Sequence, residues 1–121
     1  MKKSVNVLGT KYSVLLKRYE DDEAFSRNKW VGYCDENTKE IVVCKLLSHP
    51  GWNGDCTPKS AEVSEKQTLR HEIVHAFLDE SGLSYSALQY GSAWAKNEEM
   101  IDWFAIQGPK VYAAWQEAGA L

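Results

Sequence analysis

The chain begins with two short segments in which apolar and polar positions alternate, a pattern typical of β-strands with one buried face. These segments cover residues 4–8 and 11–17, and Gly9-Thr10 between them is a short hairpin signal. Leu15 interrupts the alternation, which indicates that the second strand is covered on both faces. The pattern therefore predicts a β-hairpin at the start of the domain.

A second pair of apolar segments follows a polar stretch, residues 20–28, which we expect to form a loop or a short turn of helix. The two segments are residues 30–34 and 41–46, and the polar run 35–39 between them is typical of a hairpin loop. Together the four segments predict a small N-terminal sheet.

The second half of the chain has the three- and four-residue spacing of apolar side chains that predicts helices. Residues 48–58 are rich in Gly and Pro and are expected to form the loop that joins the sheet to the first helix. Ser64 and Gln67 make a capping box, and Gly82 is a C-terminal stop, so the helix is predicted between Ser64 and Gly82. Its apolar residues cover more than one narrow stripe, and we expect it to be buried on most sides.

A second helix is predicted from Ser92 or Trp94 to Gln107. Gly108-Pro109 ends this helix, and the proline is well placed to begin a further helix that ends near Gly119. A sheet followed by helices predicts an α+β fold.

The first predicted helix carries His71, Glu72 and His75 in an H-E-x-x-H sequence. Residues four apart on a helix lie on the same face, so both imidazoles can reach one metal ion. Zinc in catalytic sites usually has three protein ligands and an open position for water, whose pKa the metal lowers. Glu72 is the residue that can accept the proton of that water.

The next predicted helix contains acidic residues that can supply the third ligand. Glu98 and Asp102 share a helical face, so one can bind the metal while the other accepts the free N–H of a liganding histidine. Glu99 is the alternative ligand, and it lies about 100° round the helix from Glu98. The four-residue spacing to Asp102 favours Glu98.

H-E-x-x-H followed by N-E-x-x-x-D resembles the gluzincins, the thermolysin-type zinc metallopeptidases whose third ligand is a glutamate. The short chain and the run E-M-I-D-W-F-A at residues 99–105 are also similar to the ImmA/IrrE-like metallopeptidases of phages and mobile elements. The resemblance covers roughly the C-terminal half. It implies a minimal zincin-like domain, in which a small sheet precedes an active-site helix and a second, glutamate-bearing helix.

Carried over to this chain, the resemblance implies one zinc ion held by His71, His75 and Glu98. It makes Asp102 the hydrogen-bond partner of a liganding histidine, His71. Glu72 becomes the general base that activates water for peptide-bond hydrolysis, and afterwards the proton donor. The implied partner is a peptide or a protein, such as a regulatory protein of the repressor type.

The resemblance also implies a residue that stabilises the oxyanion and a strand that binds substrate, but no motif identifies either one. A tyrosine or histidine commonly stabilises the oxyanion in zinc peptidases of this type, and Tyr85 and Tyr90 are the candidates here. Aromatic packing is the simpler interpretation of both. By the same resemblance, one of the strands at residues 30–34 and 41–46 would pair with an extended substrate backbone, and an ordinary sheet strand is the alternative.

Length and charge limit the function classes. A chain of 121 residues predicts one domain over residues 1–121. Its net charge of −3 and the lack of clustered basic residues argue against binding of nucleic acid. No apolar run is long enough for a bilayer and no signal peptide is evident, so we expect a cytoplasmic protein without a membrane partner.

The three cysteines, Cys34, Cys44 and Cys56, fit neither a disulfide framework nor a C-x-x-C metal motif. We expect free thiols in a reducing compartment. A zinc site that uses Cys56 or His49 is an alternative, although His49 has no partner at metal-ligand spacing and reads more simply as a surface loop residue.

Two other function classes remain open. One is a non-catalytic, zinc-stabilised binding or regulatory module of phage or mobile-element origin. Glu72 argues against it, because a purely structural site needs no base. The other is an interaction protein that uses its aromatic surface and carries the motif incidentally. Failure to bind stoichiometric metal would favour that last class.

Overall fold

The computed structural model of the chain describes residues 1–52, 56–86 and 94–121, with the backbone alone for residues 85 and 86. Its strands form one mixed sheet in the order β1-β2-β4-β3. They are β1 (Ser4–Val7), β2 (Thr10–Lys17), β3 (Gly32–Asp35) and β4 (Glu40–Cys44). The α-helices are α1 (Glu23–Asn28), α2 (Pro58–Glu80), α3 (Leu83–Ser86) and α4 (Glu98–Glu117). Short 3-10 turns are η1 (Tyr19–Asp21), η2 (Leu46–Ser48) and η3 (Trp94–Lys96). The predicted α+β class is confirmed.

Both predicted hairpins are present, and a parallel pairing joins them. β1 pairs with β2 and β3 with β4 in antiparallel fashion, while β2 lies parallel to β4 with Val14 opposite Ile41. The first turn is Leu8-Gly9 rather than Gly9-Thr10. Both of its residues have positive φ, 51° and 91°, the backbone that a two-residue hairpin loop requires. The parallel pairing makes β3 an edge strand.

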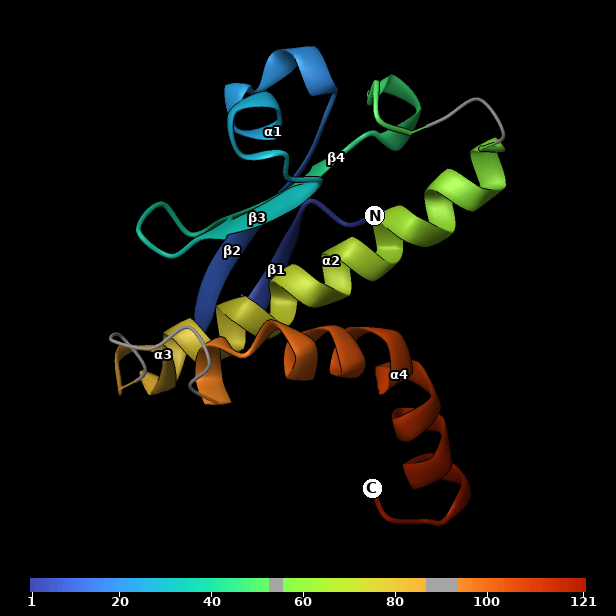
Figure 1. Cartoon of the computed structure of the whole chain (residues 1–121). Coiled ribbons are helices and arrows are strands. Elements are labelled where there is room, and N and C mark those ends of the chain that lie inside the picture. Colours follow the sequence, from blue (N-terminus) through green and yellow to red (C-terminus); the bar gives the residue numbers. More distant parts are fainter. Residues whose placement is uncertain (53–55, 87–93) are drawn as a thin grey trace.

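Apolar side chains cover both faces of the sheet. One cluster packs the sheet against α2, and its buried members are Val7, Tyr12, Val14, Ile41 and Ala76. A second cluster packs the other face against α1, with Phe25, Val42 and Cys44 as its buried members. Leu15 packs against the second cluster, which confirms that β2 is covered on both sides. Figure 1 shows α1 and α2 on opposite sides of the sheet.

The start of α2 differs from the prediction. The helix begins at Pro58 rather than after Ser64, and Thr57 is its N-cap, with the hydroxyl accepting a hydrogen bond from the Ser60 N–H at 3.1 Å. Proline suits the first helical position because the N–H that it lacks would have no partner there. The Ser64 capping box therefore lies inside a helix that a Thr-Pro pair had already begun.

The helix α2 ends where the sequence predicts, but it is less buried than predicted. The helix stops at Glu80, and Gly82 follows with a φ of 84°. Its sheet-facing side is buried at Ala76, but Phe77 is 41% and Val63 is 59% exposed. The expectation of burial on most sides is wrong because α2 packs on one face of the sheet and contacts α4 over part of its length (Figure 1).

α4 begins at Glu98, where Asn97 accepts a hydrogen bond from the Met100 N–H at 2.8 Å. It continues through Pro109, so the predicted break is wrong. The proline leaves the carbonyl of Ala105 without its helical donor, and the Nε–H of Arg70 in α2 donates to that oxygen at 2.6 Å. Figure 1 shows that α4 bends, so that its C-terminal part runs away from α2.

A third apolar cluster joins α2 to the start of α4. Its buried members are Leu78, Ala95 and Ile101, and Val74 and Met100 pack against them. None of the helices within the described ranges combines the length and the apolar character that crossing a bilayer would require.

Candidate metal centre

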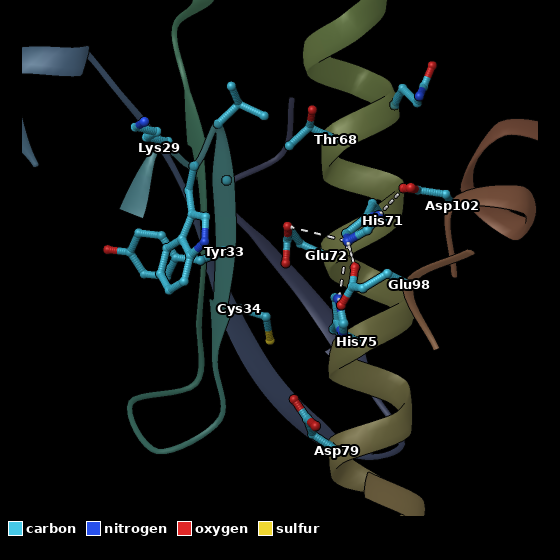
Figure 2. Close-up of a pocket in the computed structure, with 14 residues that line it drawn as sticks. Lys29, Tyr33, Cys34, Thr68, His71, Glu72, His75, Asp79, Glu98 and Asp102 are labelled. Atoms are coloured by element: carbon cyan, nitrogen blue, oxygen red, sulfur yellow. Dashed lines mark hydrogen bonds and ion pairs between the residues drawn. The ribbon is translucent and has the colours of Figure 1, made fainter. Parts of the chain in front are cut away.

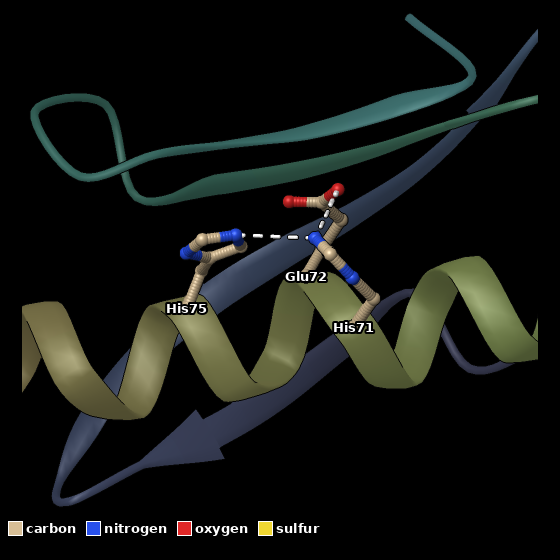
Figure 3. A group of neighbouring side chains, drawn as sticks. All are labelled: His71, Glu72 and His75. Carbon is tan, nitrogen blue, oxygen red and sulfur yellow. Dashed lines mark hydrogen bonds and ion pairs between the residues drawn. The ribbon is translucent and has the colours of Figure 1, made fainter. Parts of the chain in front are cut away.

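The three residues of the H-E-x-x-H sequence lie on consecutive turns in the middle of α2, and Figure 3 shows their side chains above one side of the helix. One ligand atom from each of His71, Glu72 and His75 lies within 4.8 Å of the others, a group that could hold a metal ion. The two imidazoles point Nε2 toward Nε2, with 3.1 Å between these atoms. Neutral imidazoles this close need a shared hydrogen atom or a shared cation between them.

Glu98 brings its carboxylate to the same point from α4. Its Oε2 lies 3.1 Å from Nε2 of His71, and its Oε1 lies 3.2 Å from Nε2 of His75. Tetrahedral zinc, with ligand bonds of about 2.05 Å, requires donor atoms about 3.3 Å apart. The two nitrogens are therefore separated by nearly the distance found between zinc ligands, and each nitrogen lies at nearly that distance from one of the two oxygens of Glu98. Figure 2 shows them converging between the two helices.

Asp102 lies behind His71. Its Oδ1 is 2.7 Å from Nδ1 of His71, on the side of the ring opposite to His75 and Glu98. This hydrogen bond assigns the proton to Nδ1 and leaves the lone pair of Nε2 directed at the other donors. The structure thus places Asp102 where it can orient His71, in the position expected from the sequence.

Glu99, the alternative ligand, points elsewhere. It lines a separate surface hollow, together with Trp94, Asn97, Met100 and Trp103. The start of α4 at Glu98 gives the two glutamates different directions, about 100° apart. Of the two, the structure brings Glu98 to the imidazoles.

Glu72 is the most enclosed acid of the site, with 7% of its surface exposed. Its Oε1 lies 3.9 Å from Nε2 of His71. Burial raises the pKa of Glu72 to about 7, the nearby His71 opposes this, and the carboxylates of Glu98 and Asp102 add to it. A bound divalent cation would lower this pKa again. In the metal-free protein, this carboxylate therefore exchanges its proton close to neutral pH.

His75 is also enclosed. Burial lowers its pKa, while the neighbouring Glu98 acts in the opposite direction. The lowered pKa favours the neutral imidazole, which is the form that binds a metal.

A pocket of about 570 Å³ opens between α2 and the edge strand β3 (Figure 2). Its lining includes all five site residues and, from the strand side and the rest of α2, Lys29, Trp30, Val31, Gly32, Tyr33, Cys34, Gln67, Thr68 and Asp79. A Cβ atom on Gly32 would lie 2.6 Å from Cγ2 of Thr68 and 3.6 Å from Cγ of Glu72. Glycine at this position therefore allows the edge strand to approach the helix closely.

The two strands proposed for substrate pairing differ in position. β4 lies inside the sheet between β2 and β3, whereas β3 borders the pocket and, among the described residues, pairs with a strand on one side only. Only β3, of these two, has an edge that a further strand could join.

The other residues that the sequence suggested for the site do not contribute to this centre within the described residues. Tyr90 and the side chain of Tyr85 lie outside the described residues. His49 accepts a hydrogen bond from the Gly51 N–H at 2.9 Å and packs edge-on against Tyr19, with 4.8 Å between the ring centres. Within the described ranges, neither His49 nor Cys56 belongs to a group of histidine, cysteine and acidic side chains with metal-ligand spacing.

The three cysteines are unpaired, as predicted. Cys34 is the one that lines the pocket, and burial raises the pKa of its thiol to about 12. A thiol with this pKa is protonated at neutral pH and is a weak nucleophile.

Sequence reasoning left open which of the two candidate strands borders the site, and it missed one residue of α2, Asp79. The choice between the two strands has no local signal, because it depends on which strand becomes the edge of the sheet. Asp79 does have one: it lies four residues after His75, and therefore on the same helical face.

Comparison of the chain with known protein families, with characterised proteins and with solved structures finds no match. The fold and the site therefore define the class by themselves. The protein is an α+β domain with a four-stranded mixed sheet and a His-Glu-His group on its longest helix that could hold a metal ion.

Proposed function

We propose that the protein is a zinc-dependent metallopeptidase of the minimal gluzincin type, with His71, His75 and Glu98 as the ligands of one zinc ion. The observation that carries the proposal is the convergence of these three side chains: the two Nε2 atoms lie 3.1 Å apart, and each lies 3.1–3.2 Å from one oxygen of the Glu98 carboxylate. Two nitrogens and a carboxylate are a ligand set typical of catalytic zinc. The resemblance of the H-E-x-x-H and N-E-x-x-x-D sequences to gluzincins supports the same conclusion.

When bound, zinc supplies a Lewis acid that polarises a peptide carbonyl and lowers the pKa of a water molecule. The chain's own residues do the rest. Asp102 holds the proton on Nδ1 of His71, which keeps Nε2 available for the metal. The buried carboxylate of Glu72 accepts the proton of the attacking water and then delivers it to the leaving nitrogen.

The pocket suits an extended peptide. One wall is the edge strand β3, whose free backbone groups can pair with a substrate backbone, and the other wall is the site face of α2. Such pairing would carry a peptide carbonyl past Glu72 and the imidazoles. We therefore infer a peptide or protein substrate bound in extended form, with a regulatory protein as the class that the sequence resemblance suggests.

The test is hydrolysis by the zinc-loaded protein and by its Glu72→Gln variant, measured on a mixture of capped peptides by mass spectrometry. Glutamine has the shape of the glutamate but cannot accept the proton, so we expect full zinc content and a loss of hydrolysis of about a hundredfold or more. Glu99→Gln is the matched control and should retain both. Peptidase activity in Glu72→Gln would rule out the assigned base.

Zinc binding without any hydrolysis by the wild-type protein would instead favour the second function, a zinc-stabilised binding or regulatory module. Elemental analysis of the same samples separates this outcome from the absence of a metal site.

A further inference from the structure

The pocket holds one carboxylate that the proposed chemistry does not use. Asp79 lies one helical turn beyond His75 on the same face of α2, and Figure 2 shows its carboxylate directed toward β3, below the thiol of Cys34. Its charge is one of the influences, after burial, that raise the pKa of that thiol. Asp79 therefore faces the space between strand and helix rather than bulk solvent.

The other carboxylates of the pocket have basic neighbours. Glu98 and Asp102 lie within 3.2 Å of imidazole nitrogens, and Glu72 lies 3.9 Å from His71. In the part of the chain that the structure describes, no lysine, arginine or histidine forms an ion pair with Asp79. Its sequence neighbour Glu80 does have one, with Lys39 at 3.1 Å.

The segments outside the described residues cannot supply the missing charge. Residues 53–55 and 87–93 contain no lysine, arginine or histidine. Lys29, the lysine that lines the pocket, lies at the opposite end of it in Figure 2, beyond Tyr33. In the described ranges, the carboxylate of Asp79, near His75, is therefore the one carboxylate of the pocket for which no side-chain ion pair is formed.

We propose that Asp79 is a specificity-determining residue, which selects peptides with a lysine or arginine within two residues of the bond that is cleaved. This inference rests on the proposed peptidase function. One helical turn rises about 5.4 Å, and an extended peptide advances about 3.3 Å per residue, so Asp79 lies opposite a side chain one or two residues from the metal-facing carbonyl. A long basic side chain can reach its carboxylate, whereas an acidic side chain there would meet an unpaired like charge.

The first experiment uses the zinc-loaded, full-length protein and a mixture of capped peptides of random sequence, with cleavage sites read by mass spectrometry. Lysine and arginine should occur near the cleaved bonds about five- to tenfold more often than aspartate and glutamate, the size expected of one partly enclosed ion pair. Asp79→Asn should remove this enrichment, and Asp79→Lys should reverse its sign. Glu99→Gln changes an acid outside the pocket and should leave the enrichment as it is.

The second experiment measures binding without turnover. Two capped peptides of one alanine-rich sequence, with a central lysine or a central glutamate, are titrated into the zinc-loaded Glu72→Gln protein and into the same protein with Asp79→Asn added. The lysine peptide should bind about five- to tenfold more tightly, and the added substitution should remove the difference.

The outcomes separate the two proposals. Cleavage with no basic preference, or with a preference that Asp79→Asn leaves intact, would overturn the role of Asp79 and leave the peptidase in place. If no peptide is cleaved, the peptidase proposal fails, and equal binding of the two peptides would then overturn the role of Asp79 as well.

Discussion

The guanidinium of Arg70 donates a hydrogen bond to the carbonyl of Ala105 at 2.6 Å, and this carbonyl is the one that Pro109 leaves without a helical partner. A missing donor in one helix is therefore replaced from the next. Arg70 directly precedes His71, and Ala105 lies about one turn after Asp102. The contact thus holds α4 beside α2 close to the point where their site residues meet.

Arg70→Met should separate these two helices without removing a site residue. Methionine keeps much of the length and the helix propensity but leaves the carbonyl of Ala105 unpaired, so we expect a loss of about 1–2 kcal/mol in the free energy of unfolding of the metal-free protein. Zinc affinity should also fall, because Glu98 and Asp102 are less well held. Urea unfolding and chelator competition measure the two effects. Arg27→Met, at an exposed ion pair, is the control, and an equal effect there would contradict the role of Arg70.

Glu98→Ala and Glu99→Ala should differ sharply in zinc binding. Glu98 lies within 3.2 Å of both imidazoles, whereas Glu99 borders a separate hollow. Removal of a ligand leaves two imidazoles and water, so the affinity of Glu98→Ala should fall by more than about a hundredfold, and that of Glu99→Ala should be nearly unchanged. Competition with a chromophoric chelator measures both. A larger loss in Glu99→Ala would reassign the third ligand.

Asp102→Asn should weaken zinc binding without abolishing it. The amide can present its NH₂ group to Nδ1 of His71, which favours the tautomer with the proton on Nε2 and blocks that nitrogen. We expect a loss of about 10- to 100-fold in affinity. The same competition measurement, repeated with Asp102→Glu to restore a carboxylate, checks the cause. No change in Asp102→Asn would show that this hydrogen bond does not orient the ligand.

Gly32→Ala should push the edge strand away from the helix. Its Cβ would lie 2.6 Å from Cγ2 of Thr68 and 3.0 Å from the carbonyl oxygen of Val42, and overpacking of this kind costs about 1–3 kcal/mol. Adding Thr68→Ser removes the methyl group and should recover part of the loss. Gly108→Ala is the control, because its Cβ would be 3.7 Å from Phe104 in ordinary contact within a helix. Thermal unfolding of the four proteins measures the effects, and a double variant no more stable than Gly32→Ala would contradict the close contact with Thr68.

Glu80 should make the protein lose stability in acid. Hydrogen bonds from Thr10, Tyr12 and Lys39 hold the pKa of Glu80 at about 2, well below its ordinary value of 4.5. A folded-state pKa below the unfolded one contributes stability above pH 4.5, and that stability is lost as the pH falls from about 4.5 to 2. When the free energy of unfolding of the metal-free protein is measured between pH 7 and pH 2, it should therefore fall less steeply with decreasing pH in Glu80→Gln than in the wild-type protein.

The control for this measurement is Glu117→Gln, at the exposed end of α4. Its curve should run parallel to that of the wild-type protein. If Glu80→Gln also runs parallel to it, the hydrogen bonds at the end of α2 do not contribute to acid unfolding.

Local patterns predicted which helices and strands form better than they predicted where each helix begins and ends. Alternation along the first half was enough for both hairpins, and its interruption at Leu15 was enough for the coverage of β2 on both faces. The start of α2 was misplaced because two caps compete: Thr57 followed by Pro58 begins the helix before the Ser64 capping box is reached. Continuation of α4 through Pro109 depends on a donor from another helix, which no local pattern contains.

The candidate site likewise has one part that local spacing predicts and another that it does not. Helical spacing brings His71 and His75 together and turns Glu98 rather than Glu99 toward them, and these directions follow from 3.6 residues per turn. The sequence offered two strands for the opposite wall of the pocket and could not choose between them, because β3 becomes the edge strand only when β2 and β4 pair in parallel across a long connection. Pairing over such distances depends on the packing of the whole sheet.

The two sources of the metal donors have a further consequence. His71 and His75 lie in the middle of α2, while Glu98 is the first residue of α4. A metal held by all three would act as a cross-link, and it would turn the connection between the helices into a closed loop. In the chain-entropy model, closing a loop of about 20 residues lowers the conformational entropy of the unfolded chain. This stabilises the folded state by about 3 kcal/mol. Zinc would then protect the domain against unfolding and proteolysis, and a chelator would expose it to both.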